Sequence, residues 1–184
     1  IMNYFRNIIA VPARIESSRL PNKVIMDIGG KSMLERVLER CSLAKNADLV
    51  VLCTDSTKLM LIAEKLGYKV FMTSKECKSG TDRIASITKE LVKFAWSNLK
   101  TNNLSHQNQI DRTLIVNVQG DQPFINPEII DKTFEKLRSM QPNTHVITPI
   151  YKLSKRNIHN PNVVKTLIRN NGEIIYFSRS AIPH

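Results

Sequence analysis

A loop near the start of the chain concentrates three cations. Arg14, Arg19 and Lys23 recur at intervals of five and four residues, directly after the apolar run Asn7–Val11. Arginine binds phosphate oxygens through paired hydrogen bonds, and lysine supplies a point charge. Such a loop could hold a triphosphate and neutralise a departing pyrophosphate. It lacks the glycines of a Walker A loop, and its spacing alone slightly favours an ordinary solvated loop.

A single carboxylate follows a second apolar run. Asp121 comes shortly after Thr113–Val118, and Gly120 before it would let backbone or a ligand approach closely. Magnesium in proteins is bound by one or two carboxylates together with phosphate oxygens and water. Asp121 is therefore a candidate metal ligand. An aspartate in an ordinary Gly-Asp-Gln-Pro turn is the alternative interpretation.

The elements that must position these residues alternate between two patterns. Short apolar runs predict buried strands, and apolar stripes at helical spacing predict amphipathic helices. Strands are expected at residues 7–11, 48–53, 68–72, 113–118 and 146–149. Helices are expected at residues 32–41, 57–66, 81–95 and 126–137. The polar stretch 98–112 is expected to be an exposed, mobile loop, and Asn170-Asn171-Gly172 to turn a hairpin between 163–168 and 173–177.

This alternation predicts an α/β fold of three layers, α/β/α. The sheet is expected to be mostly parallel with helices on both faces, because successive βαβ units produce that arrangement. The hairpin is expected to add antiparallel strands at one side. Ligands of such sheets bind beyond the carboxyl ends of the strands. The rule selects the loops after Val11, Met72 and Val118.

Composition and charge exclude several classes of protein. The 184 residues are 42% hydrophobic, which is typical of a globular chain, and no apolar stretch is long enough for a membrane span. The net charge of +11 would suit a polyanionic partner, but the sequence contains no run of five basic residues. We therefore expect the basic side chains to be solvated, and we expect no nucleic-acid partner and no membrane partner. Cys41, Cys53 and Cys77 fit no zinc pattern and favour a reducing, cytoplasmic location.

Four blocks of sequence resemble, in the same order, the 3-deoxy-D-manno-octulosonate (Kdo) cytidylyltransferases, or CMP-Kdo synthetases. The blocks are Pro-Ala-Arg with Ser-Arg-Leu-Pro-Asn-Lys at 12–23, Ser-Gly-Thr-Asp-Arg at 79–83, Val-Asn-Val-Gln-Gly-Asp-Gln-Pro at 116–123, and Asn-Pro-Asn-Val-Val-Lys with Tyr-Phe-Ser-Arg-Ser-Ala-Ile-Pro at 160–183. The first block is shared with the sialic acid enzymes, whereas the second and third are more specific. The resemblance implies a nucleotide-diphospho-sugar transferase (GT-A-like) fold.

The resemblance also implies a reaction and roles for individual residues. CTP and Kdo would give CMP-Kdo and pyrophosphate for lipopolysaccharide biosynthesis, with Mg²⁺ as cofactor. Contacts with the triphosphate are implied for Arg14, Arg19 and Lys23, and a metal-ligand role for Asp121. Binding of cytidine is implied for Ala13, Ser79 and Arg83, and binding of the sugar for Gln119 and Arg179.

Departures from the family pattern leave alternatives open. Asn22 stands where the family usually has glycine, and Gln122 where it usually has glutamate. The family continues past the final block with more sugar-binding and metal-binding residues. Residues 1–184 are therefore expected to be one nucleotidyltransferase domain that is incomplete at the C-terminus. The apolar side chains of its last strand are expected to be exposed. The complete protein is expected to be a homodimer. A cytidylyltransferase for another acidic sugar, such as 8-amino-Kdo or sialic acid, and a non-catalytic nucleotide-binding remnant remain alternatives.

Overall fold

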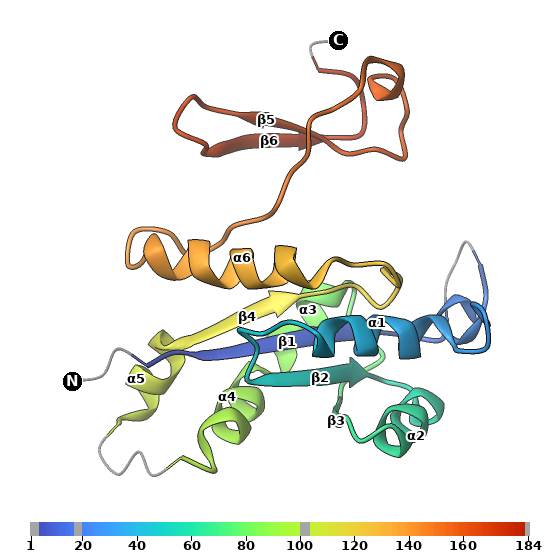
Figure 1. Cartoon of the computed structure of the whole chain (residues 1–184), viewed down its shortest axis with the longest axis vertical. Coiled ribbons are helices and arrows are strands. Elements are labelled where there is room, and N and C mark those ends of the chain that lie inside the picture. The colour runs from blue at the N-terminus through green and yellow to red at the C-terminus, as the bar shows by residue number, and fades with distance from the viewer. Residues whose placement is uncertain (1–3, 17–19, 100–103, 183–184) are drawn as a thin grey trace. The chain divides into compact units, whose positions relative to one another are not determined.

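The chain forms two compact units, shown in Figure 1. The computed structural model describes residues 4–16, 20–99 and 104–182. The first unit covers residues 1–147 and the second residues 148–184. Each unit has its own sheet, and each is described by itself.

The first unit is built on a parallel sheet of four strands in the order β3-β2-β1-β4. The strands are β1 (Arg6–Ala13), β2 (Leu49–Thr54), β3 (Lys69–Met72) and β4 (Thr113–Asn117). β1 lies between β2 and β4, with Val11 opposite Leu52 and Ile8 opposite Ile115. The four strands predicted for this part of the chain are confirmed. Because they run in one direction, their carboxyl ends meet at one edge of the sheet.

Helices cover both faces of this sheet (Figure 1). They are α1 (Met33–Ser42), α2 (Thr57–Lys65), α3 (Gly80–Ser86), α4 (Thr88–Trp96), α5 (His106–Asp111) and α6 (Pro127–Ser139). Successive side chains of a strand point to opposite faces, so Ile9 and Val11 pack with α1, α2 and α6. Ile8 and Ala10 pack with α3 and α4, around the buried Trp96. The predicted three-layer architecture is confirmed.

Local signals place the helix ends. The Ser32 hydroxyl accepts a hydrogen bond from the Glu35 amide at 3.2 Å, and Asn126 caps α6 through the Glu128 amide at 3.1 Å. Such caps satisfy amides that have no partner within the helix. Gly67 follows α2 with a φ of +85°, a conformation that glycine adopts without a steric cost. These starts and stops agree with the sequence prediction.

Three expectations of local structure are wrong. The helix predicted over 81–95 is interrupted at Ile87, whose ψ of 14° is not helical, so α3 and α4 are separate. Residues 104–112 of the predicted loop 98–112 are not all loop, because Ser105 caps the short helix α5 and Ile110 packs against the core; residues 100–103 lie outside the described residues. No strand forms at 146–149, because Val146 is exposed and Pro149 has no amide hydrogen for a strand ladder.

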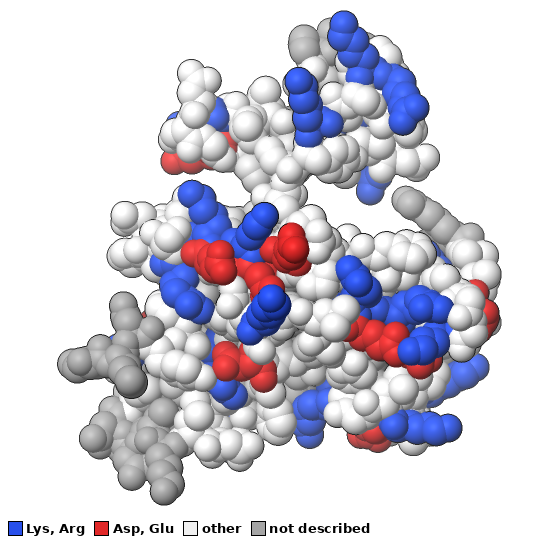
Figure 2. Space-filling view, viewed as in Figure 1, with Lys and Arg blue, Asp and Glu red and all other residues white. Residues whose placement is uncertain are grey.

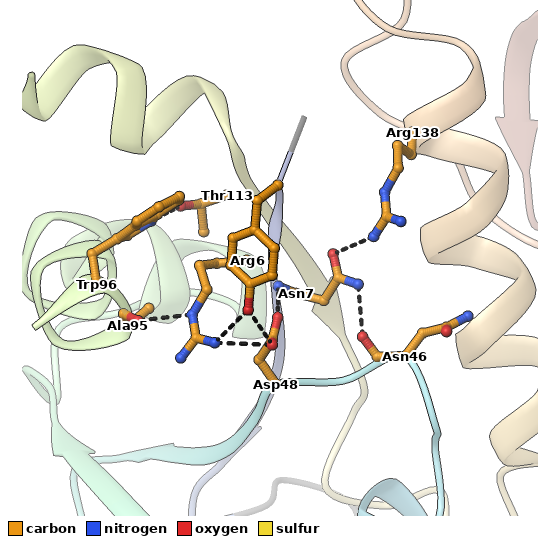
Figure 3. A network of polar contacts seen from close by, with 9 residues as sticks. Arg6, Asn7, Asn46, Asp48, Ala95, Trp96, Thr113 and Arg138 are labelled. Carbon is orange, nitrogen blue, oxygen red and sulfur yellow. Dashed lines mark hydrogen bonds and ion pairs between the residues drawn. The ribbon is translucent and has the colours of Figure 1, made fainter. Parts of the chain in front are cut away.

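A polar network fixes the amino ends of the strands, at the edge opposite their carboxyl ends (Figure 3). Arg6 Nη1 lies 2.9 Å from Asp48 Oδ1, and Arg6 Nε donates to the Ala95 carbonyl at 2.8 Å. The buried Asn7 receives a hydrogen bond from Arg138 Nη2 at 3.2 Å. Each polar side chain named here has a hydrogen-bond partner, as buried polar groups generally do. The network anchors β1, β2, α4 and α6 to one another.

The second unit is an antiparallel hairpin of β5 (Lys165–Ile168) and β6 (Ile174–Ser178), preceded by the 3₁₀ helix η2 (Lys155–Asn157). The predicted antiparallel hairpin is confirmed, and its two strands form a sheet of their own. The buried Lys165 ammonium donates to the carbonyls of Asn160, Val163 and Arg179 at 2.5–2.9 Å. The first four side chains of β6 are 38–58% exposed, as expected from the sequence.

The three cysteines are buried and unpaired. Burial raises the pKa of the Cys41 and Cys53 thiols to about 12. Both thiols therefore stay protonated near neutral pH and act as small apolar side chains, as predicted.

The surface of the first unit carries both signs of charge. On the face shown in Figure 2, its Lys and Arg side chains lie among Asp and Glu side chains. Within residues 4–16, 20–99 and 104–182, no helix is both long and apolar enough to cross a membrane. The prediction of no nucleic-acid partner stays a prediction.

Candidate active site

A pocket of about 240 Å³ opens at the carboxyl edge of the parallel sheet. Three loops form it: the loops that follow β1, β3 and β4. The lining residues are Pro12, Ala13, Arg14, Glu16, Lys23, Val24, Cys77, Lys78, Ser79, Gly80, Arg83, Gln119, Gly120 and Asp121. These are the loops selected by the rule for parallel sheets. The lining includes four cationic and two anionic side chains, so its balance favours an anionic ligand.

The loop after β1 brings two of the three predicted cations to the pocket. Arg14 is exposed and has no ion-pair partner among the described residues. Lys23 begins the 3₁₀ helix η1 (Lys23–Ile25), directly after Asn22 at a φ of +59°. Asparagine is one of the few residues besides glycine that tolerates this conformation, so Asn22 suits a position where the resemblance implies a glycine. Arg19 lies outside the described residues.

The loop after β4 supplies the carboxylate. Asp121 Oδ2 lies 2.6 Å from Lys23 Nζ, and the two side chains are 45% and 34% exposed. The described residues contain no group of three His, Cys, Asp or Glu side chains that could hold a metal ion. Asp121 therefore fits Mg²⁺ only as one ligand beside phosphate oxygens and water, a common arrangement for this metal. Its carboxylate already attracts a cation, in the form of the Lys23 ammonium.

The block 79–83 forms the wall contributed by the loop after β3. The Ser79 hydroxyl accepts a hydrogen bond from the Asp82 amide at 3.0 Å and so caps α3. Arg83 is buried and bonds within the protein: Nη2 lies 2.8 Å from Asp55 Oδ2, and Nη1 donates to the Thr73 hydroxyl. Both Ser79 and Arg83 line the pocket, but most of their polar groups hold the wall together.

Close packing joins this wall to the opposite loop. A Cβ atom on Gly80 would lie 2.8 Å from Pro12 Cγ and 2.9 Å from Gln119 Oε1, so any larger residue would require these side chains to shift. Gln119 Nε2 donates to Asn117 Oδ1 at 2.7 Å. The Gly120 amide donates to the Pro12 carbonyl at 3.2 Å, beside Ala13. The pocket floor is therefore backbone of β1 and of the loop after β4.

Comparison with known proteins agrees with this geometry. The profile of the cytidylyltransferase family matches residues 8–184. The chain belongs to the cytidylyltransferase family. The match includes all three loops of the pocket.

Curated relatives of this chain carry a more specific name. The chain is 37% identical over 179 residues to the 3-deoxy-manno-octulosonate cytidylyltransferase of Chloroherpeton thalassium, covering 96% of this chain and 65% of the relative. It is 39% identical over 176 residues to the protein of that name from Francisella tularensis subsp. novicida, covering 95% and 63%. The chain thus spans less than two thirds of the length of these relatives.

Solved structures give the same assignment of the fold. CMP:2-keto-3-deoxy-manno-octonic acid synthetase complexed with CTP superposes with a TM-score of 0.77 at 31% identity, covering 97% of this chain and 66% of that one. A cytidylyltransferase from Leptospira borgpetersenii gives a TM-score of 0.53 at 26% identity, covering 76% and 51%. The cytidylyltransferase fold thus extends over nearly all of this chain.

The sequence prediction missed several residues of the pocket. Lys78 and Cys77 line it, and Asp55 holds Arg83 in the wall. Asp55 comes directly after the buried strand β2, and Asp121 likewise lies shortly after β4. The rule that ligands bind beyond the carboxyl ends of parallel strands could therefore have found Asp55 as well. Nothing in the sequence pattern singles out Cys77. Arg179 belongs to the second unit, and its contact with sugar stays a prediction.

Gly80→Ala is expected to disturb the pocket. The new Cβ would force apart Pro12 and Gln119, which costs about 1–3 kcal/mol of unfolding free energy when no space exists. Nucleotide binding should weaken as well, because the pocket walls shift. Thermal unfolding and nucleotide titration would measure both effects. Ala85→Val adds methyl groups at an exposed position of α3 and is the control; an equally small loss from both variants would contradict the close packing at Gly80.

Proposed function

We propose that this protein activates Kdo with CTP, giving CMP-Kdo and pyrophosphate for lipopolysaccharide biosynthesis. The observation that carries the proposal is the convergence of Arg14, Lys23 and Asp121 on one pocket whose wall is the block 79–83. The CTP complex of the structural neighbour and the names of the curated relatives support cytidine as the base and Kdo as the sugar.

The arrangement suits a reaction that needs positioning and charge neutralisation. The anomeric oxygen of Kdo would attack the α-phosphorus, and the bond from that phosphorus to the β-phosphate oxygen would break. The hydroxyl proton leaves to solvent, and pyrophosphate carries away the negative charge. Arg14 would bind phosphate oxygens with a guanidinium that has no ion-pair partner in the described part of the chain, and Lys23 would neutralise the leaving group. No protein nucleophile is needed.

We assign Mg²⁺ as the cofactor and Asp121 as its ligand from this chain. When bound, the ion would stabilise charge on the phosphates and orient them for in-line attack. The exposed position of Asp121 beside two phosphate-binding candidates supports this role. Ala13 and the wall at Ser79 and Arg83 would enclose cytidine. Gln119 would face the sugar.

We further propose that residues 1–184 make one nucleotidyltransferase domain, which in the relatives is completed by the third that this chain does not match. The complete protein would be a cytoplasmic homodimer. The exposed apolar side chains of β6 support a further packing partner, and the three free cysteines support a reducing compartment. Sedimentation of the protein from the complete reading frame would measure the oligomeric state.

Pyrophosphate release tests the function. The protein encoded by the complete reading frame is incubated with CTP, Mg²⁺ and either Kdo, 8-amino-Kdo or N-acetylneuraminic acid. We expect release with Kdo to exceed that with the other sugars. Faster release with either alternative sugar would reassign the substrate, and release with none would favour a nucleotide-binding protein without transfer activity.

A further inference from the structure

Two residues far apart in the sequence meet at the mouth of the pocket. Lys23 Nζ and Asp121 Oδ2 are separated by 2.6 Å, although 98 positions separate the residues along the chain. Each is placed by a tight backbone feature, because Lys23 follows Asn22 in its left-handed conformation. Asp121 follows Gly120, where an added Cβ would lie 3.0 Å from Ala13 Cβ. The backbone conformations of the loops after β1 and β4 therefore determine where this ion pair forms.

The pair is poorly suited to a structural role. Both side chains are more than a third exposed, and exposed ion pairs contribute little to stability. Lys23 is the only ion-pair partner that Asp121 has among the described residues. The ammonium lies where a cation bound to this carboxylate would lie. A metal ion arriving alone would therefore have to displace a like charge.

We propose that Lys23 holds the metal position at Asp121 until the nucleotide arrives, and that metal and triphosphate then enter together. Triphosphate offers Lys23 a new anionic partner, which frees Asp121 for Mg²⁺. The two binding events favour each other, and such coupling is reciprocal. This inference rests on the proposed function, because it takes Asp121 as a metal ligand and the triphosphate as the second partner of Lys23.

Binding of Mn²⁺ to the nucleotide-free protein tests this directly. Mn²⁺ accepts the same oxygen ligands as Mg²⁺, and its free concentration is read by electron paramagnetic resonance. Lys23→Gln is expected to raise the affinity at Asp121 about three- to fivefold, because it removes a cation that competes for the carboxylate, while exposure to solvent keeps the effect of one charge small. Lys23→Arg keeps the charge and should keep the affinity low.

Lys31→Gln is the matched control. Lys31 also pairs with a carboxylate, that of Glu39, and its side chain is 42% exposed, but it does not line the pocket. Its removal should leave Mn²⁺ affinity unchanged. If Lys23→Gln also leaves it unchanged, or if Lys31→Gln raises it equally, the proposal is overturned.

The double variant Lys23→Gln/Asp121→Asn separates this proposal from the proposed function. It should lose the gained affinity; retention would show that Mn²⁺ binds elsewhere and would overturn the proposal together with the metal role of Asp121. Asp121-dependent Mn²⁺ binding that is insensitive to Lys23 would overturn only the present proposal. If Lys23→Gln fails to fold, acetylation of Lys23 relative to Lys78 decides instead. Labelling should increase in Asp121→Asn, and equal labelling would overturn the proposal.

Discussion

Asp121→Asn is expected to remove most of the gain that Mg²⁺ gives to CTP binding. The substitution deletes the only carboxylate that lines the pocket from the loop after β4. Loss of a charged ligand from a metal–phosphate site costs a few kcal/mol, which corresponds to about a hundredfold weaker Mg²⁺-dependent binding. Binding of CTP without metal should not weaken, because Lys23 loses its partner and becomes free for phosphate. Calorimetric titrations with Mg²⁺ and with a chelator would measure the difference.

The control for Asp121→Asn is Asp27→Asn. Asp27 is also an exposed aspartate in a turn, where its Oδ1 accepts a hydrogen bond from the Gly30 amide at 3.1 Å, and it does not line the pocket. Its substitution should leave Mg²⁺ dependence unchanged. If Asp121→Asn instead lowers the melting temperature and keeps normal Mg²⁺ dependence, Asp121 is only a turn residue.

Arg83→Met is expected to produce the largest loss of stability. The Arg83 and Asp55 side chains are 4% and 15% exposed, and their charged atoms lie 2.8 Å apart. Removing one partner leaves the other charge buried without compensation, which costs about 3–5 kcal/mol. That is a large part of the 5–15 kcal/mol by which domains are typically stable. Urea unfolding followed by circular dichroism would measure it.

Two further variants show whether the buried ion pair is the cause. Lys31→Met breaks the pair with Glu39, which is about 40% exposed on both sides, and should cost at most about 1 kcal/mol. Arg83→Met/Asp55→Leu should recover part of the lost stability, because it leaves no unpaired charge. Equal losses of stability in Arg83→Met and Lys31→Met would show that the ion pair of Arg83 with Asp55 does not stabilise the pocket wall.

The sequence predicts the central strands β1 and β2 well because most of their side chains are buried, on both faces of the sheet. The run Asn7–Val11 is almost continuously apolar, and β1 is buried along nearly its whole length. The break at Ile87 could not be predicted, since the apolar stripe from Ile84 to Leu91 continues through it. There the packing of α3 and α4 against the sheet overrides the helical pattern. The strand expected at 146–149 fails because nothing described buries Val146.

The site could be predicted only as a set of loops. The rule for parallel sheets selects the correct strand ends. Residue chemistry makes Arg14, Lys23 and Asp121 candidates, and only the family resemblance assigns them to a site. The direct pairing of Lys23 with Asp121 depends on two tight turns whose geometry no spacing rule supplies. Likewise, the resemblance implies that Arg83 binds cytidine, whereas no sequence pattern shows that the fold pairs it with Asp55.

Nucleotide selectivity tests the central claim most directly. The chain is titrated calorimetrically with CTP, UTP, ATP and GTP, each in excess Mg²⁺. If the pocket enclosed by Ala13, the block 79–83 and Asp121 is a cytidine triphosphate site, CTP should bind at least about tenfold more tightly than any of the other three, a difference of about 1.4 kcal/mol. Equal affinity for all four nucleotides would contradict the assignment of this pocket to CTP.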